Sequence, residues 1–208
     1  MPLSAPGYSP AAGAPMESVT EDAPLSAQPF MGDLGITEVL DLLIDEAAAS
    51  LALLSDFQLG EPSIEDFIEH DRPVWEEIHI VFRMGFSIGG RARMGLLGLT
   101  VPEVLTLAAC LLMMPMDAVA ENRAKSAPDE GDKEAIMEAG TLIASAFRAT
   151  LSKRINALVD VQFFGCQGVA ALEPPWISGF EAEPLAIRTH SASFAKFEPF
   201  SMVMVIPV

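Results

Sequence analysis

The most regular hydrophobic pattern in the chain runs from Asp132 to Ile155. Apolar positions recur there at steps of three and four, the spacing that gathers side chains on one side of an α-helix: Ile136, Gly140, Ile143, Phe147, Leu151 and Ile155. A second row with the same spacing is polar throughout: Glu134, Glu138, Thr141, Ser145, Arg148 and Ser152. The pattern predicts a long amphipathic helix, N-capped by Asp132, with one buried face and one face of carboxylates and hydroxyls.

A second long helix is predicted from Asp33 to Phe57. Its apolar side consists of Val39, Leu40, Leu43, Ala47, Leu51 and Leu54. Glu38, Asp41 and Asp45 follow one another at helical spacing, and the segment has no lysine or arginine to balance them. Such an acidic face is stable when it is well solvated or when a basic partner covers it.

The segment from Trp75 to Met84 alternates with a period of two, as a half-buried strand does. In this register Ile78 faces the core and His79 faces away from it. The turn Gly89-Gly90 then returns the chain into a second strand from Arg91 to Leu97.

Further strands are predicted over residues 159–164, 169–172, 185–194 and 200–206. A loop or one short helical turn is predicted over 58–73, and a loop over 117–131. Thr100 and Glu103 have the spacing of a capping box for a helix from Val101 to Met114. Together these elements predict an α/β (α+β) domain, residues 33–208, whose helices pack on a mainly antiparallel sheet.

Composition narrows the classes of function. Residues 1–32 contain six prolines and no apolar core of a signal peptide, so they predict a flexible arm. The net charge is −17, and fourteen acidic residues precede Arg72, the first basic residue. Because a field of that sign repels nucleic acid and anionic membrane, neither is expected as a partner. The apolar run over residues 94–116 is interrupted by Pro102 and Glu103 and predicts a core helix, with no membrane insertion.

Only two cysteines, Cys110 and Cys166, occur, both in apolar surroundings, which predicts reduced thiols in a cytoplasmic protein. The three histidines are scattered without the spacing of metal ligands, so we predict no metal site. The sequence also contains no glycine-rich phosphate-binding motif, so we predict no cofactor. Short strands leave sheet edges that need cover, and the stretch from Phe200 to Ile206 is apolar and extended, so we predict a homodimer through strands or a helix face.

The two long helices share a short pattern at an offset of one hundred residues. Glu38-Val-Leu-Asp41-Leu matches Glu138-Ala-Gly-Thr141-Leu, which indicates weakly that a helix-plus-sheet unit is duplicated.

The stretch Glu138-Ala-Gly-Thr-Leu-Ile-Ala-Ser-Ala-Phe resembles the signature helix of the CheC/CheX/FliY chemotaxis phosphatase family. The segment from Arg91 through Val101-Pro-Glu-Val-Leu resembles the strand and shorter helix that precede it. The resemblance implies a pseudo-symmetric sheet with two long helices on one face. It also implies binding of a CheY-like response regulator and hydrolysis of its aspartyl phosphate.

The family pattern is Asp or Ser, three residues, Glu, two residues, Asn. Carried over by resemblance, Glu138 is the glutamate that contacts the regulator, Thr141 stands in place of the asparagine, and Glu134 in place of the leading residue. In the first helix Glu38 matches again, and Asp41 replaces the asparagine. Glu134 and Ser145, on the same row as Glu138, are expected to contact the partner.

The substitutions bear on the chemistry. An aspartyl phosphate is a reactive acyl phosphate, so a catalyst mainly positions the attacking water. An amide offers a donor and an acceptor at long reach, whereas Thr141 offers both on a shorter arm and Asp41 would repel a phosphoryl group. Three readings remain open: a phosphatase, a non-catalytic binder of a response regulator or motor-switch-like protein, and an unrelated domain. A small-molecule enzyme is the alternative from another class.

Overall fold

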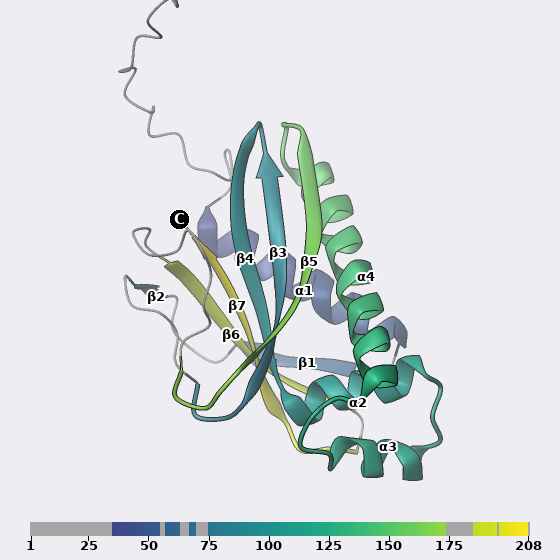
Figure 1. Ribbon diagram of the computed structural model, residues 1–208. Coiled ribbons are helices and arrows are strands. Elements are labelled where there is room, and N and C mark those ends of the chain that lie inside the picture. Colours follow the sequence, from purple (N-terminus) through teal and green to yellow (C-terminus); the bar gives the residue numbers. More distant parts are fainter. Residues whose placement is uncertain are drawn as a thin grey trace, which may run out of the picture.

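The computed structural model describes residues 35–54, 57–62, 67–69, 75–173, 185–194 and 196–207 (Figure 1). The predicted arm, residues 1–32, lies outside these ranges. The helices are α1 (Ile36–Leu54), α2 (Val101–Leu111), α3 (Met116–Arg123) and α4 (Glu130–Arg154). The strands are β1 (Phe57–Pro62), β2 (Phe67–Glu69), β3 (His79–Ile88), β4 (Arg91–Thr100), β5 (Val159–Val169), β6 (Leu185–Phe194) and β7 (Phe200–Pro207).

The strands form a single sheet in the order β1-β6-β7-β4-β3-β5, and β2 pairs with β6 beside this path. Every neighbouring pair is antiparallel. The predicted fold class, helices packed on a mainly antiparallel sheet, is therefore confirmed.

The strand order is symmetric about the centre of the sheet. Exchanging β1 with β5, β6 with β3, and β7 with β4 reverses the order and returns the same sheet. The central pair β4–β7 is registered around Leu97 opposite Met204, and α1 and α4 precede the first strand of each half. The duplicated helix-plus-sheet unit that the two glutamate motifs indicate is thus present in the topology.

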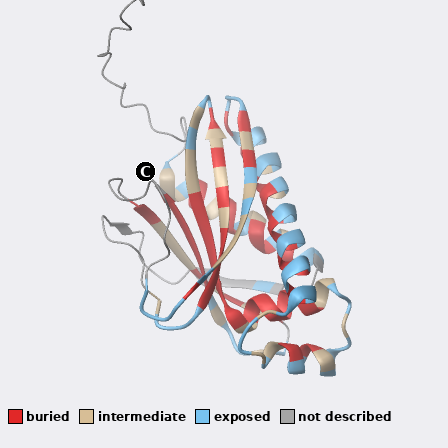
Figure 2. Cartoon of the chain, in the orientation of Figure 1, coloured by how far each residue is buried: buried red, intermediate tan, exposed pale blue. Residues whose placement is uncertain are grey.

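The main core lies between the sheet and the helices. Figure 2 shows the inner faces of α1, α2 and α4 buried against the strands. Phe82, Phe86 and Phe147 are among the largest side chains that are fully enclosed there. A smaller apolar cluster, which includes Val81, Leu96 and Val205, lies on a separate part of the sheet with Trp75 packed against it.

Both predicted faces of α4 are confirmed. Every member of its apolar row is buried, and every member of its polar row is exposed. The helix begins earlier than predicted, however, and its N-cap is Asp129 instead of Asp132. Asp132 is the third helical residue and is buried, because it completes a capping box in which each aspartate accepts the other's backbone N–H at 3.0 Å.

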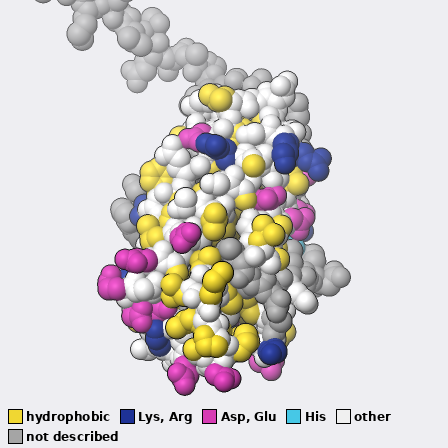
Figure 3. All heavy atoms as spheres, turned by 90° about the vertical axis from the view of Figure 1, so that its right-hand side faces the viewer, with side chains coloured by type: hydrophobic (Ala, Val, Ile, Leu, Met, Phe, Trp, Pro, Cys, Tyr) yellow, Lys and Arg dark blue, Asp and Glu magenta, His cyan; other side chains and the backbone are white. Residues whose placement is uncertain are grey.

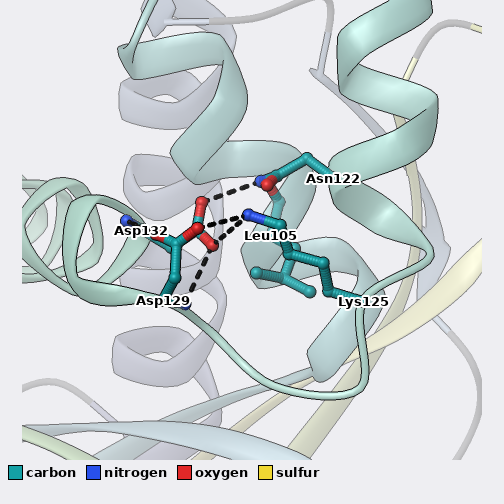
Figure 4. A network of polar contacts seen from close by, with 5 residues as sticks. All are labelled: Leu105, Asn122, Lys125, Asp129 and Asp132. Atoms are coloured by element: carbon teal, nitrogen blue, oxygen red, sulfur yellow. Dashed lines mark hydrogen bonds and ion pairs between the residues drawn. The ribbon is translucent and has the colours of Figure 1, made fainter.

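The prediction of a loop over residues 117–131 is wrong in its first half, which forms α3. Figure 4 shows what holds this helix in place. Asn122 Nδ2 donates to the carbonyl of Leu105 on α2 at 3.0 Å and to Asp132 Oδ1 on α4 at 2.9 Å. Lys125 Nζ donates to both carboxylates of the capping box. Val119 and Asn122 are the buried residues of α3, so a helical row of buried apolar residues does not mark this helix in the sequence. The buried polar contacts of Asn122 position it instead.

Several strand predictions also need correction. Residues 58–73, predicted as a loop or one short helical turn, contain β2 and most of β1. Of the two predicted strand pieces, 159–164 and Val169 belong to one bulged strand, β5, whereas residues 170–172 lie beyond its end. The bulge lies opposite Phe82 and Met84, where Gly165 adopts a φ of +96°. His79 is buried and stacks on Trp75, whereas Ile78 is exposed, so their predicted orientations are wrong.

Two further expectations concern strand and helix ends. The segment from Phe200 is not a sheet edge: β7 pairs with β6 on one side and β4 on the other, which removes the stated basis for a homodimer through this strand. Thr100 makes no side-chain cap, and Glu103 instead binds Arg123 of α3.

Candidate functional site

The candidate site is the polar row of α4, here called the α4 stripe: Glu134, Glu138, Thr141 and Ser145. All four side chains are exposed, and Glu138 and Thr141 lie one helical turn apart on the same face. Within the described part of the chain, the side chains of Glu134 and Glu138 make neither an ion pair nor a hydrogen bond. Both carboxylates are therefore available to an external partner.

The hydroxyls of the α4 stripe bond back to their own helix. Thr141 Oγ1 donates to the carbonyl of Met137 at 3.0 Å, and Ser145 Oγ donates to the carbonyl of Thr141 at 2.9 Å. This is the local back-bonding of hydroxyl side chains in helices. Because the Thr141 proton is used in this way, the hydroxyl offers only acceptor capacity outward.

Apolar side chains flank the α4 stripe. Met137 is 45 % exposed, Leu142 42 % and Phe164 of β5 54 %. A cavity of about 480 Å³ opens beside the helix, with Ile136, Met137 and Cys166 in its wall. In Figure 3, which views this side of the molecule, hydrophobic side chains gather over the lower half of the face with acidic side chains around them. Exposed apolar groups next to unpaired charges are typical of a protein-binding surface.

The matching residues of α1 have a different environment. Glu38 is exposed, but Asp41 Oδ1 accepts a hydrogen bond from Nε of Arg188 on β6 at 2.7 Å. His190 Nε2 lies 3.8 Å from the same oxygen. Burial and the nearby Arg188 lower the pKa of His190, so its ring favours the neutral form. The carboxylate of Asp41 is thus paired with a cation of the same chain, whereas the carboxylate of Glu138 has no such partner among the described residues.

The motifs of α1 and α4 are not joined by a direct polar contact in the described part of the chain. Among the described residues, no hydrogen bond or ion pair joins Glu38 or Asp41 to Glu138 or Thr141. The link between the helices runs elsewhere, from Thr150 Oγ1 of α4 to Glu46 of α1. Sequence reasoning missed Arg188 and His190, although two basic residues at positions i and i+2 of a strand do point to one face.

The described residues contain no group of three or more His, Cys, Asp or Glu side chains arranged to hold a metal ion. None of the described helices has the length and the apolar character that crossing a membrane requires.

No family model matches the sequence, and no curated protein matches it. Solved structures do match. The crystal structure of Thermotoga maritima FliY aligns with a TM-score of 0.63 and 14 % identity over 83 % of this chain and 88 % of that one. A chemotaxis protein CheX from Desulfovibrio desulfuricans aligns with a TM-score of 0.54 and 12 % identity over 81 % and 97 %.

A third match is the CheX–CheY–BeF3–Mg complex from Borrelia burgdorferi, with a TM-score of 0.50 and 14 % identity over 82 % of this chain and 98 % of that one. The fold class is therefore an antiparallel sheet with two long helices in a pseudo-symmetric arrangement. More particularly, this chain has the fold of the CheC/CheX/FliY chemotaxis proteins, as the signature helix predicted.

Proposed function

We propose that this chain acts in chemotaxis-type signalling by binding a CheY-like receiver domain through the α4 stripe. The observation that carries the proposal is the exposed Glu138 carboxylate, which has no partner within the described part of the chain and lies one turn from Thr141. Support comes from a protein of the same fold that was crystallised in complex with CheY. In this proposal Glu138 contacts a basic residue of the receiver, and the neighbouring Met137 and Leu142 supply apolar area.

Hydrolysis of the receiver's aspartyl phosphate is the second candidate. It is favoured by the position of Thr141, one turn from Glu138, with an acceptor oxygen facing solvent. A water molecule held for in-line attack must give its proton to an acceptor while its lone pair faces phosphorus. Thr141 supplies only that acceptor, since its own proton is bonded to Met137. The geometry therefore favours binding over efficient catalysis.

The test is calorimetric titration of the full chain with a CheY-type receiver in its beryllofluoride-activated form. We expect Glu138→Lys to weaken binding by at least about tenfold, because it reverses the charge at the contact. Glu121→Lys on α3 is the matched control, being an exposed glutamate outside the α4 stripe, and should bind as the wild type does. Equal affinity of both variants and the wild type would remove the proposal.

The catalytic question is tested separately by the decay of phosphorylated receiver. Thr141→Asn restores the amide of the family pattern, and we expect it to accelerate dephosphorylation if the receiver docks as proposed. No acceleration, together with loss of binding by Glu138→Lys, defines the chain as a binder only. A cytoplasmic location and a homodimer remain proposals of the same kind, and the dimer is checked by light scattering.

A further inference from the structure

A second cavity, of about 520 Å³, lies apart from the α4 stripe, and α4 contributes no residue to its described lining. Its wall is formed where four segments meet: the residues before β3, the junction of β4 with α2, the end of α3, and the start of β7. Its size falls within the range of small-molecule sites in proteins. The cavity is not explained by the symmetry of the sheet, and it takes no part in the proposed receiver contact.

The cavity contains a buried carboxylate with unused bonding capacity. Glu103, which lines it, is only 3 % exposed. One of its oxygens, Oε1, accepts a hydrogen bond from Arg123 at 2.5 Å, whereas Oε2 has no hydrogen-bond partner among the described residues. Leaving a buried charged acceptor unpaired is costly, so such a group calls for an explanation. A donor from a bound ligand would satisfy it.

Acceptors and negative charge predominate among the polar groups of the lining, which also includes the hydroxyls of Thr100 and Ser201. His79 Nδ1 lies 2.6 Å from the carbonyl oxygen of Glu77, so this nitrogen carries the proton and, in the neutral ring, Nε2 is an acceptor. Glu76, Glu77 and Glu198 add three exposed carboxylates. With Glu103 and Arg123, the described lining holds four acidic groups and one basic group, a net charge of −3.

Aromatic surfaces complete the wall. Trp75 stacks on His79 with ring centroids 4.7 Å apart, and Phe200 of β7 also lines the cavity. The lining cation, Arg123, is already occupied, because it pairs with Glu103 and lies 4.8 Å above the Phe197 ring. Acceptors, negative charge and aromatic faces together are the complement of a planar or compact organic cation.

We propose that this cavity binds a small organic cation, an alkyl-guanidinium or alkyl-ammonium group, with Glu103 Oε2 and His79 Nε2 accepting its N–H donors. The same chemistry is carried by free small molecules and by arginine or lysine side chains. The site is independent of receiver binding, so loss of one does not entail loss of the other.

The experiment is calorimetric titration of the full chain at an ionic strength of about 0.15 M. The charged probe is n-butylguanidinium, and n-butylurea is its neutral isostere. The charged probe should bind saturably with one site, and the urea should not. Glu103→Gln, which keeps the shape and removes the charge, should weaken binding by at least about tenfold, while Glu121→Gln should stay within about twofold. The latter residue is exposed on α3 and does not line the cavity.

Circular dichroism shows whether Glu103→Gln folds. If it does not, Glu198→Gln, at the exposed part of the lining, replaces it, and we expect this variant to bind n-butylguanidinium about threefold more weakly than the wild type. N-acetyl-arginine amide separates the two sources: tighter binding than n-butylguanidinium assigns a polypeptide side chain, and weaker binding assigns a free small molecule. The proposal is overturned by absence of saturation, by equal binding of the urea, or by an equal loss with Glu121→Gln. The last result would mean general attraction to an acidic chain.

Discussion

Asp41 on α1 and Arg188 on β6 are 147 residues apart in the chain, yet Arg188 Nε donates to Asp41 Oδ1 at 2.7 Å. The Arg188 side chain is 16 % exposed and that of Asp41 40 %. In the other half of the molecule, the position matching Asp41 is Thr141, whose hydroxyl donates to the carbonyl of Met137 in its own helix. The pair therefore distinguishes the two halves: one motif is tied to the sheet, and the other is open to solvent.

Removing the Asp41 carboxylate should destabilise the fold. Asp41→Ala removes a carboxylate that accepts a hydrogen bond from the largely buried guanidinium of Arg188, for which we expect a loss of about 1–2 kcal/mol in the free energy of unfolding. Glu38→Ala, an exposed position one turn earlier on α1, should change it by less than about 0.5 kcal/mol. Urea denaturation of both variants gives the comparison, and equal stabilities would show that the ion pair contributes nothing.

At one position of α4, an aromatic ring of β5 leaves room for a glycine but not for a larger residue. A Cβ added at Gly140 would meet three ring atoms of Phe163 at 2.4 to 2.7 Å. Gly140→Ala should therefore lower stability by about 1–3 kcal/mol, in spite of the better helix propensity of alanine.

Gly131 supplies the matched control within the same helix. A Cβ there would meet only Asp129 Oδ1, at an ordinary 3.5 Å. Gly131→Ala should be neutral or stabilising by up to about 1 kcal/mol. The midpoint of thermal unfolding should thus fall for Gly140→Ala and stay the same or rise for Gly131→Ala. A stabilised Gly140→Ala would show that Phe163 moves aside without cost.

Much of the fold could be predicted because long periodic segments carry their own signal. The spacing of apolar residues was enough to predict the two rows of α4 and the strand β6. The exposure of Glu138 beside Thr141 followed from the same pattern, since a polar row opposite a buried row faces solvent.

The errors have a common physical origin in long-range contacts. The helix α3 depends on Asn122 reaching Leu105 and Asp132, and β1 and β2 depend on pairing with β6 more than a hundred residues later. The alternating pattern alone predicts that the His79 side chain faces away from the core, whereas in the structure it stacks on Trp75 and is buried. For the same reason the Arg188 contact of Asp41, and the cavity that contains Glu103, could not be found from local spacing.

The thiol of Cys166 should be unreactive in the folded protein. Burial raises its pKa to about 12 from an ordinary value of 9.0, because the thiolate is poorly solvated there. At pH 8 the thiolate fraction is then about a thousandfold smaller than in the unfolded chain. In a Cys110→Ser background, iodoacetamide should modify Cys166 at least about a hundredfold faster in denaturant than in buffer. Similar rates in both conditions would show that the half-buried position of Cys166 does not protect its thiol.

The N-cap of α4 should make stability depend on pH in the acid range. Hydrogen bonding to Lys125, and then to the backbone N–H of Asp132, lowers the pKa of Asp129 from 3.8 to about 2. Because the folded value is the lower one, the ionised carboxylate favours the fold above about pH 4, and this contribution is lost as the pH falls through about 2. Asp129→Asn keeps a capping oxygen but removes the titration, so its stability deficit relative to wild type should narrow between pH 5 and pH 3. Chemical denaturation across this range tests the prediction. Glu134→Gln, an exposed change on the same helix, should show no such narrowing, and a constant deficit for Asp129→Asn would mean that the carboxylate caps the helix only as a neutral acceptor does.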